Sequence, residues 1–137
     1  MNIRYYKDSD YEEIKNILQS WGHFDEVWDS RSHWGAKIEK DPTSILVAES
    51  DNEVVGCQLI IKDEWTCFLF RLAIKENFRN QGIWSMLMKK AEDQLRDEGV
   101  DEVAFFVNED DLKLQEYYER RDYIKGWKYR CMYKKLQ

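Results

Sequence analysis

The sequence predicts an α/β fold (α+β in some classifications) in which a mixed central β-sheet is flanked by about four helices. Two observations lead to this prediction. Apolar, β-branched runs at residues 45–49, 54–61 and 66–74 predict three strands joined by short turns. An amphipathic run at residues 83–98 then separates the last of these strands from another apolar run at residues 103–107. Antiparallel hairpins followed by a βαβ unit require a mixed sheet.

The N-terminal part predicts one strand and two helices. Residues 3–6 form a short strand candidate, and Asp8, Ser9 or Asp10 can cap the helix that follows. That helix carries apolar residues at helical spacing, namely Ile14, Ile17 and Leu18. A second helix is expected over residues 30–40, ending before Asp41 and Pro42, because the residue before a proline disfavours helical geometry.

The central part predicts a hairpin, a buried strand and the most periodic helix of the chain. Asp51 and Asn52 are expected to form the hairpin turn, and residues 66–74 read as a strand that is apolar on both faces. Gly99 follows the helix of residues 83–98 at the position of a C-cap. The buried stripe of that helix is expected to comprise Ile83, Met86, Leu87, Ala91 and Leu95.

The C-terminal part predicts strand, helix and strand. Residues 103–107 read as a buried strand, and Asp110 or Asp111 begins a helix that ends near Arg121. Residues 123–135 alternate apolar and polar side chains, which predicts a final strand pair or one long strand. The expected order is β-α-α-β-β-β-α-β-α-β.

Composition narrows the class of protein. A chain of 137 residues with 43% hydrophobic residues predicts a single folded domain over residues 1–137. A net charge of −6 argues against a nucleic-acid binder, which needs a basic surface. The three cysteines and two histidines lack metal-site spacing, so no metal is expected. Without an apolar signal or a membrane-length apolar run, we expect a cytoplasmic protein with no membrane partner.

The loop of residues 75–82 carries the most informative pattern. It joins a buried strand to a long helix and contains Arg79 and Gly82 in an R-x-x-G arrangement. The first backbone N–H groups of a helix lack intrahelical partners and, with the helix dipole, attract anions. Gly82 would let the backbone approach such a ligand closely. A pyrophosphate could therefore lie across the N–H groups of residues 81–85, including that of Ser85, with Arg79 beside it.

This region resembles the acyl-CoA-binding motif of the GNAT superfamily of N-acetyltransferases. The stretch FRLAIKENFRNQGIWSMLMKKAE matches the motif between the fourth strand and third helix of that family. AESDNEVVG resembles its earlier hairpin, and VNEDDLKLQEYYERRDY resembles its C-terminal tyrosine region. The resemblance covers about residues 2–135 and is strongest to small, single-domain members of unassigned substrate.

The resemblance implies a cofactor and a set of residues that bind it. The cofactor would be acetyl-coenzyme A, held in a slot that a bulge opens beside the central strand. Tyr118 would be the general acid that protonates the departing thiolate, because a neutral tyrosine hydroxyl is a donor. The implied cofactor-binding residues are Leu72, Ala73 and Ile74 for the pantetheine arm, and Arg79, Asn80, Gln81, Gly82, Ile83, Trp84 and Ser85 for the pyrophosphate.

Two positions that concern the cofactor depart from the family pattern. Trp84 replaces a glycine or alanine, so its indole either crowds the cofactor or packs outward as an apolar anchor. Asp111, included among the cofactor-binding candidates, replaces a frequent asparagine. An ionised aspartate would repel phosphate but is as good a helix cap as asparagine.

The acceptor site is expected near a cluster of aromatic and acidic residues between the first helix and the hairpin. Trp28 and Asp29 are the acceptor-binding candidates there, since aromatic rings and carboxylates can hold a cationic amine. Glu64, in the turn before the central strand, is a third candidate. No residue is singled out as general base.

The function predicted from these features is acetyl transfer from acetyl-coenzyme A to a primary amine by direct attack on the thioester. The acceptor would be a small-molecule amine or a protein lysine or N-terminal amine, and a homodimer is compatible with the sequence. Two alternatives stay open: a GNAT-fold module that binds coenzyme A or senses a ligand without catalysis, and an interaction domain whose cofactor slot has lapsed.

Overall fold

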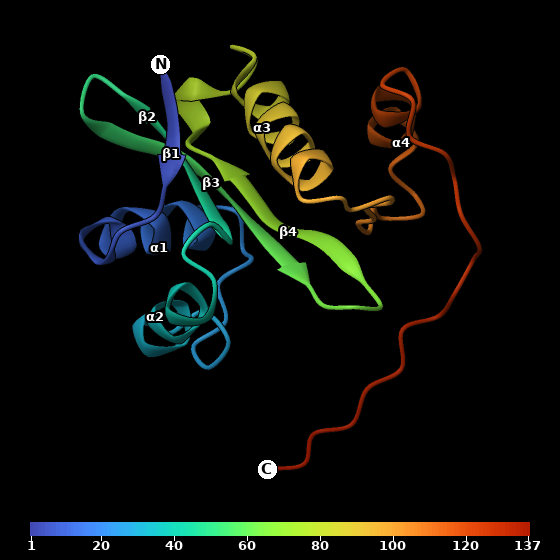
Figure 1. The fold of residues 1–137 in the computed structure, drawn as a ribbon, viewed down its shortest axis with the longest axis horizontal. Coiled ribbons are helices and arrows are strands. Elements are labelled where there is room, and N and C mark those ends of the chain that lie inside the picture. The colour runs from blue at the N-terminus through green and yellow to red at the C-terminus, as the bar shows by residue number, and fades with distance from the viewer. The chain divides into compact units, whose positions relative to one another are not determined.

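The computed structural model describes all 137 residues, in two compact units, Met1–Phe105 and Phe106–Gln137. The first unit contains β1 (Asn2–Tyr5), α1 (Tyr11–Ser20), α2 (Arg31–Lys40), β2 (Ile45–Ser50), β3 (Glu53–Lys62), β4 (Cys67–Ile74) and α3 (Ile83–Asp97) (Figure 1). Two short 3-10 turns, η1 (Asp8–Asp10) and η2 (Glu76–Phe78), precede α1 and α3. The second unit contains α4 (Leu112–Glu119).

The sheet has four antiparallel strands in the order β1-β2-β3-β4. Asp51 and Asn52 both have positive φ, 50° and 64°, which is the backbone of the tight β2–β3 hairpin turn predicted for them. A single parallel bridge joins Phe68 of β4 to Ala104. The predicted α/β class is therefore confirmed, but the parallel pairing expected of a mixed sheet is limited to this one bridge.

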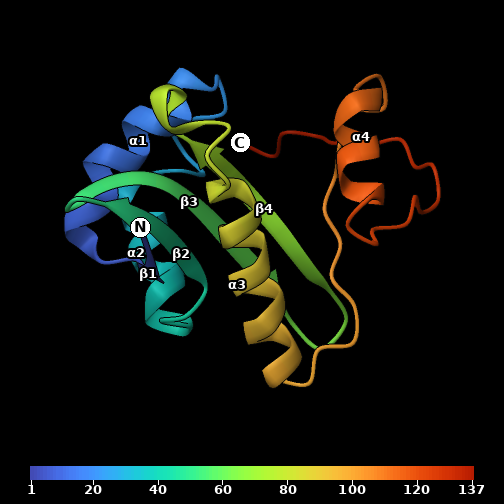
Figure 2. The ribbon, with the colours of Figure 1, turned by 90° about the horizontal axis from the view of Figure 1, so that it is seen from above.

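Helices cover both faces of this sheet (Figure 2). One face packs against α1 and α2 through a cluster that includes Ile14, Trp34 and Val47. The other face packs against α3, where a Cβ added at Gly56 would lie 3.5 Å from Leu87. Burial of apolar side chains on both faces supplies the main stabilising term, about 25 cal/mol per Å² of apolar surface.

The helix α3 begins and ends as the sequence predicts. Gly82 is its N-cap, and Gly99 follows its C-terminus with a φ of 79°. The N–H of Val100 donates to the carbonyl of Leu95, and the N–H of Gly99 donates to that of Arg96. This pair of bonds is a Schellman motif, which needs a left-handed residue and therefore favours glycine.

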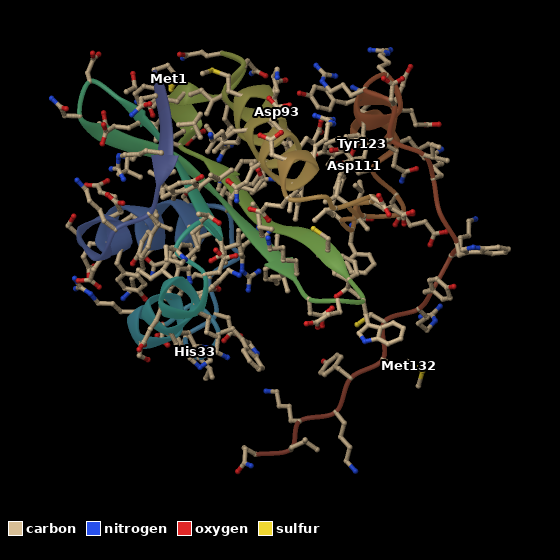
Figure 3. All side chains as sticks on the ribbon, in the orientation of Figure 1. Met1, His33, Asp93, Asp111, Tyr123 and Met132 are labelled. Atoms are coloured by element: carbon tan, nitrogen blue, oxygen red, sulfur yellow. The ribbon has the colours of Figure 1, made fainter.

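Two strand predictions are wrong. Residues 103–107 form only the bridge at Ala104, because a strand needs a continuous ladder and the neighbouring β4 supplies only two bonds there. Residues 123–135 form no strand and carry exposed apolar side chains, including Met132, whose side chain projects from the chain (Figure 3). Alternation predicts a strand only where a second strand satisfies the backbone, and the tail has none.

The second unit centres on α4 and three tyrosines. Tyr118 makes edge-to-face ring contacts with Tyr117 and Tyr123, at centroid distances of 5.3 Å and 5.7 Å. The helix begins at the predicted cap, Asp111. No helix in either unit has the length and apolar character needed to cross a membrane.

Candidate active site

A bulge interrupts β4 at the centre of the candidate site. Cys57 of β3 lies opposite Ala73, but Leu59 lies opposite Phe70. One residue of β3 therefore faces two residues of β4, Arg71 and Leu72. Arg71 has a φ of 51°, a left-handed conformation that costs a non-glycine residue about 1–2 kcal/mol. Such local strain requires compensating contacts.

An ion pair with Asp29 supplies that compensation. The Arg71 guanidinium donates from Nε to Oδ1 of Asp29 at 3.1 Å, and its Nη2 lies 3.0 Å from Oδ2. The Asp29 carboxylate is buried and also accepts from the backbone N–H of Asp25 at 2.9 Å. Bidentate pairing of this kind is strong and directional. It ties the segment between α1 and α2 to the bulge.

From the bulge to its C-terminal end, β4 has no neighbouring strand on its outer edge. The N–H of Leu69 donates to the carbonyl of Ala104, and the N–H of Ala104 donates to the carbonyl of Cys67. These two bonds cover only the start of β4, and β4 is otherwise the edge of the sheet. Ala73 and Ile74 pair with β3 on their inner side, Leu72 lies in the bulge, and no strand pairs with the outer side of these three residues. This arrangement lets an extended ligand add as a strand.

The loop after β4 places two left-handed residues just before the N-terminus of α3. Asn80 and Gly82 have φ values of 61° and 81°, and both are exposed. The first intrahelical bond runs from the N–H of Met86 to the carbonyl of Gly82, so the N–H groups before Met86 point out of the helix end. Nothing lies within 4 Å of a Cβ added at Gly82, so the space there is open. Ile83 is buried and anchors the turn.

Arg79 is held in place by Trp21. Its guanidinium lies 3.9 Å from the centre of the Trp21 ring, and its Nε donates to the carbonyl of Ile74 at 3.3 Å. The Trp21 indole donates to the same carbonyl at 2.8 Å. The two Nη groups of Arg79 make no hydrogen bond in the structure, so they can still meet an anion.

Trp84 packs towards the same tryptophan. Its ring centroid lies 6.4 Å from that of Trp21, in a tilted arrangement, and Trp84 is only partly exposed. Whether this indole crowds the cofactor or serves as an apolar anchor stays a prediction. Gln81 turns back, donating from its side chain to the carbonyl of Asn77 at 3.1 Å.

The remaining predicted cofactor and catalytic residues lie in the second unit. The Asp111 carboxylate accepts from the N–H of Leu114 at 3.0 Å, which makes it the N-cap of α4. Tyr118 is 5% exposed, and its role as general acid stays a prediction. Asp111 and Tyr123 are labelled in Figure 3.

A pocket of about 370 Å³ adjoins the bulge. It includes two of the three acceptor-binding candidates, Trp28 and Asp29, but not Glu64, which is exposed in the β3–β4 turn. The residues that line it are Trp28, Asp29, His33, Trp34, Lys37, Leu59, Ile61, Phe70 and Arg71. His33 projects from α2 (Figure 3).

Lys37 and Arg71 were missed by the sequence reasoning, and Trp21 was expected only as one of the aromatic residues near the acceptor site, not as the partner of Arg79. A signal existed for Arg71, since it is the one charged residue in the apolar run of β4. Trp21 and Lys37 carried no local signal, because their roles depend on Ile74, Arg79 and Ile60, which are distant in sequence.

The sequence of this chain is similar to a known family and to several of its members. The model of the acetyltransferase (GNAT) family matches residues 8–123. An acetyltransferase of Yersinia enterocolitica is 29% identical over 126 residues, which span 90% of this chain and 87% of the relative. One from Pectobacterium atrosepticum is 28% identical over 129 residues, with the same shares of the two chains.

Solved structures share the fold. Ard1 of Thermoplasma volcanium superposes with a TM-score of 0.78 at 22% identity, covering 92% of this chain and 84% of its own. The PaiA N-acetyltransferase of Thermoplasma acidophilum, solved in complex with coenzyme A, gives a TM-score of 0.72 at 18% identity over 88% and 87% of the two chains. Together with the family match over most of the sequence, the comparisons identify this chain as a member of the GNAT acetyltransferase family.

Proposed function

We propose that this chain is an N-acetyltransferase that moves the acetyl group of acetyl-coenzyme A to a primary amine. The observation that carries the proposal is the continuity of two features. A bulged strand with an open edge, β4, is followed, after the short turn η2, by a left-handed turn at the N-terminus of α3. An extended arm ending in a pyrophosphate has the matching shape and charge.

The cofactor fits the residues that are present. The backbone of Leu72, Ala73 and Ile74 would bind the pantetheine arm along the open edge. The turn of Arg79, Asn80, Gln81 and Gly82, with the N–H groups of Ile83, Trp84 and Ser85, would bind the pyrophosphate. The Arg79 guanidinium, already oriented by Trp21, would lose little conformational entropy on binding. When bound, acetyl-coenzyme A supplies the acetyl group as an activated thioester.

The proposed transfer is direct. The amine nitrogen forms a bond to the acetyl carbon, the carbon–sulfur bond breaks, and the amine gives one proton to solvent water. A backbone N–H of the bulge, near Leu72, would stabilise the developing oxyanion. The Tyr118 hydroxyl would give a proton to the sulfur.

A two-stage assay tests the proposal. Acetyl-coenzyme A should raise the melting temperature of the protein. When amines from a panel are then added to the protein and acetyl-coenzyme A, at least one of them should cause release of coenzyme A, which is measured by its free thiol. Tyr118→Phe should lower kcat about 10²-fold or more, as loss of a general acid does, with little change in the affinity for acetyl-coenzyme A. An unaltered kcat would remove Tyr118 from the mechanism.

A module that binds coenzyme A without acetyl transfer is the second candidate. It is favoured by the structural roles of the two departures from the family pattern: Asp111 caps α4, and Trp84 packs towards Trp21. Both candidates predict the thermal shift. Only the enzyme predicts thiol release with some amine of the panel.

A further inference from the structure

We propose that the acceptor is an amine that carries a carboxylate on an apolar body, that is, an apolar or aromatic α-amino acid. The proposal rests on the proposed function and names the substrate class of the pocket beside the bulge. It follows from the composition of that pocket and from which of its charged groups are already paired.

The pocket offers apolar surface to a ligand. Trp28 is 69% exposed and Phe70 is 42% exposed, so both rings present apolar surface at the pocket. Leu59 and Ile61 of β3 contribute further apolar lining. An aliphatic or aromatic side chain would cover these groups and remove apolar area from water.

The pocket has no free carboxylate to hold an additional ammonium group. Asp29 is its only acidic residue, and both of its oxygens are occupied. Arg71 lies 3.1 Å from Oδ1 and 3.0 Å from Oδ2, and the N–H of Asp25 lies 2.9 Å from Oδ2. A polyamine would therefore bring uncompensated positive charge into an apolar site, which is costly.

The excess charge of the pocket is positive. Lys37 and Arg71 are two cations against the single carboxylate of Asp29. The Lys37 ammonium donates to the carbonyl of Ile60 at 2.5 Å and makes no other hydrogen bond. Burial lowers the pKa of Lys37, and the negative charge of Asp41 offsets this only in part. A ligand carboxylate would give the ammonium a directly bonded counterion and accept a charge-assisted hydrogen bond.

The positions of these groups suit one ligand orientation. Lys37 lies on α2, whereas Phe70 and Arg71 lie at the bulge that carries Leu72. A carboxylate at the α2 side and an apolar body against Trp28 and Phe70 would leave the amine towards the bulge. Acetyl transfer requires the amine there, since the open edge of β4 begins at the bulge.

The test compares acceptors that differ by one group. Thiol release is measured with L-phenylalanine, with phenethylamine, which lacks only the carboxylate, and with spermidine, which adds ammonium groups. We expect kcat/KM for phenylalanine to exceed that for phenethylamine by about tenfold or more, the effect of one charge-assisted hydrogen bond. Spermidine should be the poorest. Equal or better activity with phenethylamine or spermidine overturns the inference while leaving the acetyltransferase proposal intact.

A pair of matched variants assigns the preference to Lys37. Lys37→Gln should reduce the phenylalanine-to-phenethylamine ratio to about one, whereas Lys40→Gln, an exposed lysine on the same helix, should leave the ratio unchanged. The affinity for acetyl-coenzyme A should be the same in both variants. A ratio that survives Lys37→Gln contradicts the assignment.

Direct binding keeps the test independent of catalysis. Calorimetric titration of the protein with L-phenylalanine, in the presence of coenzyme A, should give a dissociation constant that Lys37→Gln weakens about tenfold. If coenzyme A binds but phenylalanine does not, the inference is wrong. If coenzyme A fails to bind as well, the proposed function is wrong too.

Discussion

Replacing Gly82 by alanine is the most informative single perturbation of the cofactor turn. Gly82 has a φ of 81° at the N-cap of α3, and an added Cβ would meet nothing within 4 Å. The substitution therefore causes no steric clash. Its cost is the left-handed conformation, about 1–2 kcal/mol, partly offset by about 0.4–1 kcal/mol of lost freedom in the unfolded chain. We expect a net destabilisation of about 1 kcal/mol.

Two other glycines provide matched controls. Gly99 has a φ of 79° and equally open space, so Gly99→Ala should cost the same. Gly35 lies within α2, also with open space, and its φ is not in the left-handed region. Gly35→Ala should stabilise the protein by about 0.5–1 kcal/mol, because alanine is the better helix former. Urea unfolding measures all three changes.

The affinity for coenzyme A distinguishes an effect on the cofactor turn from the loss of stability that both left-handed glycine substitutions share. A methyl group on Gly82 would stand where the pyrophosphate must approach the N–H groups of α3. Loss of one charge-assisted hydrogen bond corresponds to about tenfold weaker binding. Calorimetry should give that change for Gly82→Ala and none for Gly99→Ala. Equal dissociation constants for the two variants would refute the placement of the pyrophosphate, and an unaltered stability of Gly82→Ala would refute the backbone argument.

Three further predictions concern groups around the site. Trp21→Ala should weaken coenzyme A binding several-fold without abolishing it, because Arg79 loses its stacking partner but keeps its charge; a calorimetric titration checks this. Asp111→Ala should lower the stability of α4 by about 1 kcal/mol, whereas Asp111→Asn should be neutral, and amide hydrogen exchange of α4 distinguishes them. Burial raises the pKa of the Cys57 thiol to about 12, so iodoacetamide at pH 8 should alkylate the exposed Cys131 and leave Cys57 unmodified in the native protein; mass spectrometry of the digested protein gives the result.

The elements that could be predicted from sequence share one property: their signals are local. Asp10 and Ser30 precede helices, Gly99 ends one, and Asp51 and Asn52 turn a hairpin, each within a few residues of the structure it specifies. The cofactor turn belongs to this group as well, since Gly82 and the periodicity of α3 lie side by side in the chain.

The strand predictions after α3 failed because a strand is not a local structure. Residues 103–107 and 123–135 have the composition and alternation of strands, yet a strand forms only where a neighbour supplies hydrogen bonds. Between residues 103 and 107 the neighbour, β4, supplies a bridge at Ala104 alone. The apolar pattern of a segment indicates which of its side chains favour burial. It does not indicate whether the edge of another strand is available to pair with that segment.

The sequence by itself determined the α/β class, the family resemblance and the R-x-x-G turn before a long helix. Each of these depends on residues that are close together in the chain. Only the tertiary structure decided what the charged groups do. Asp29 looked like a free carboxylate for a cationic amine, but it pairs with Arg71, which is distant in sequence and is held in a left-handed bulge. Arg79 was expected beside the pyrophosphate, and only the structure shows that Trp21 stacks on its guanidinium. Charge pairing depends on distance in space, so the polarity of the acceptor pocket could be read only from the folded chain.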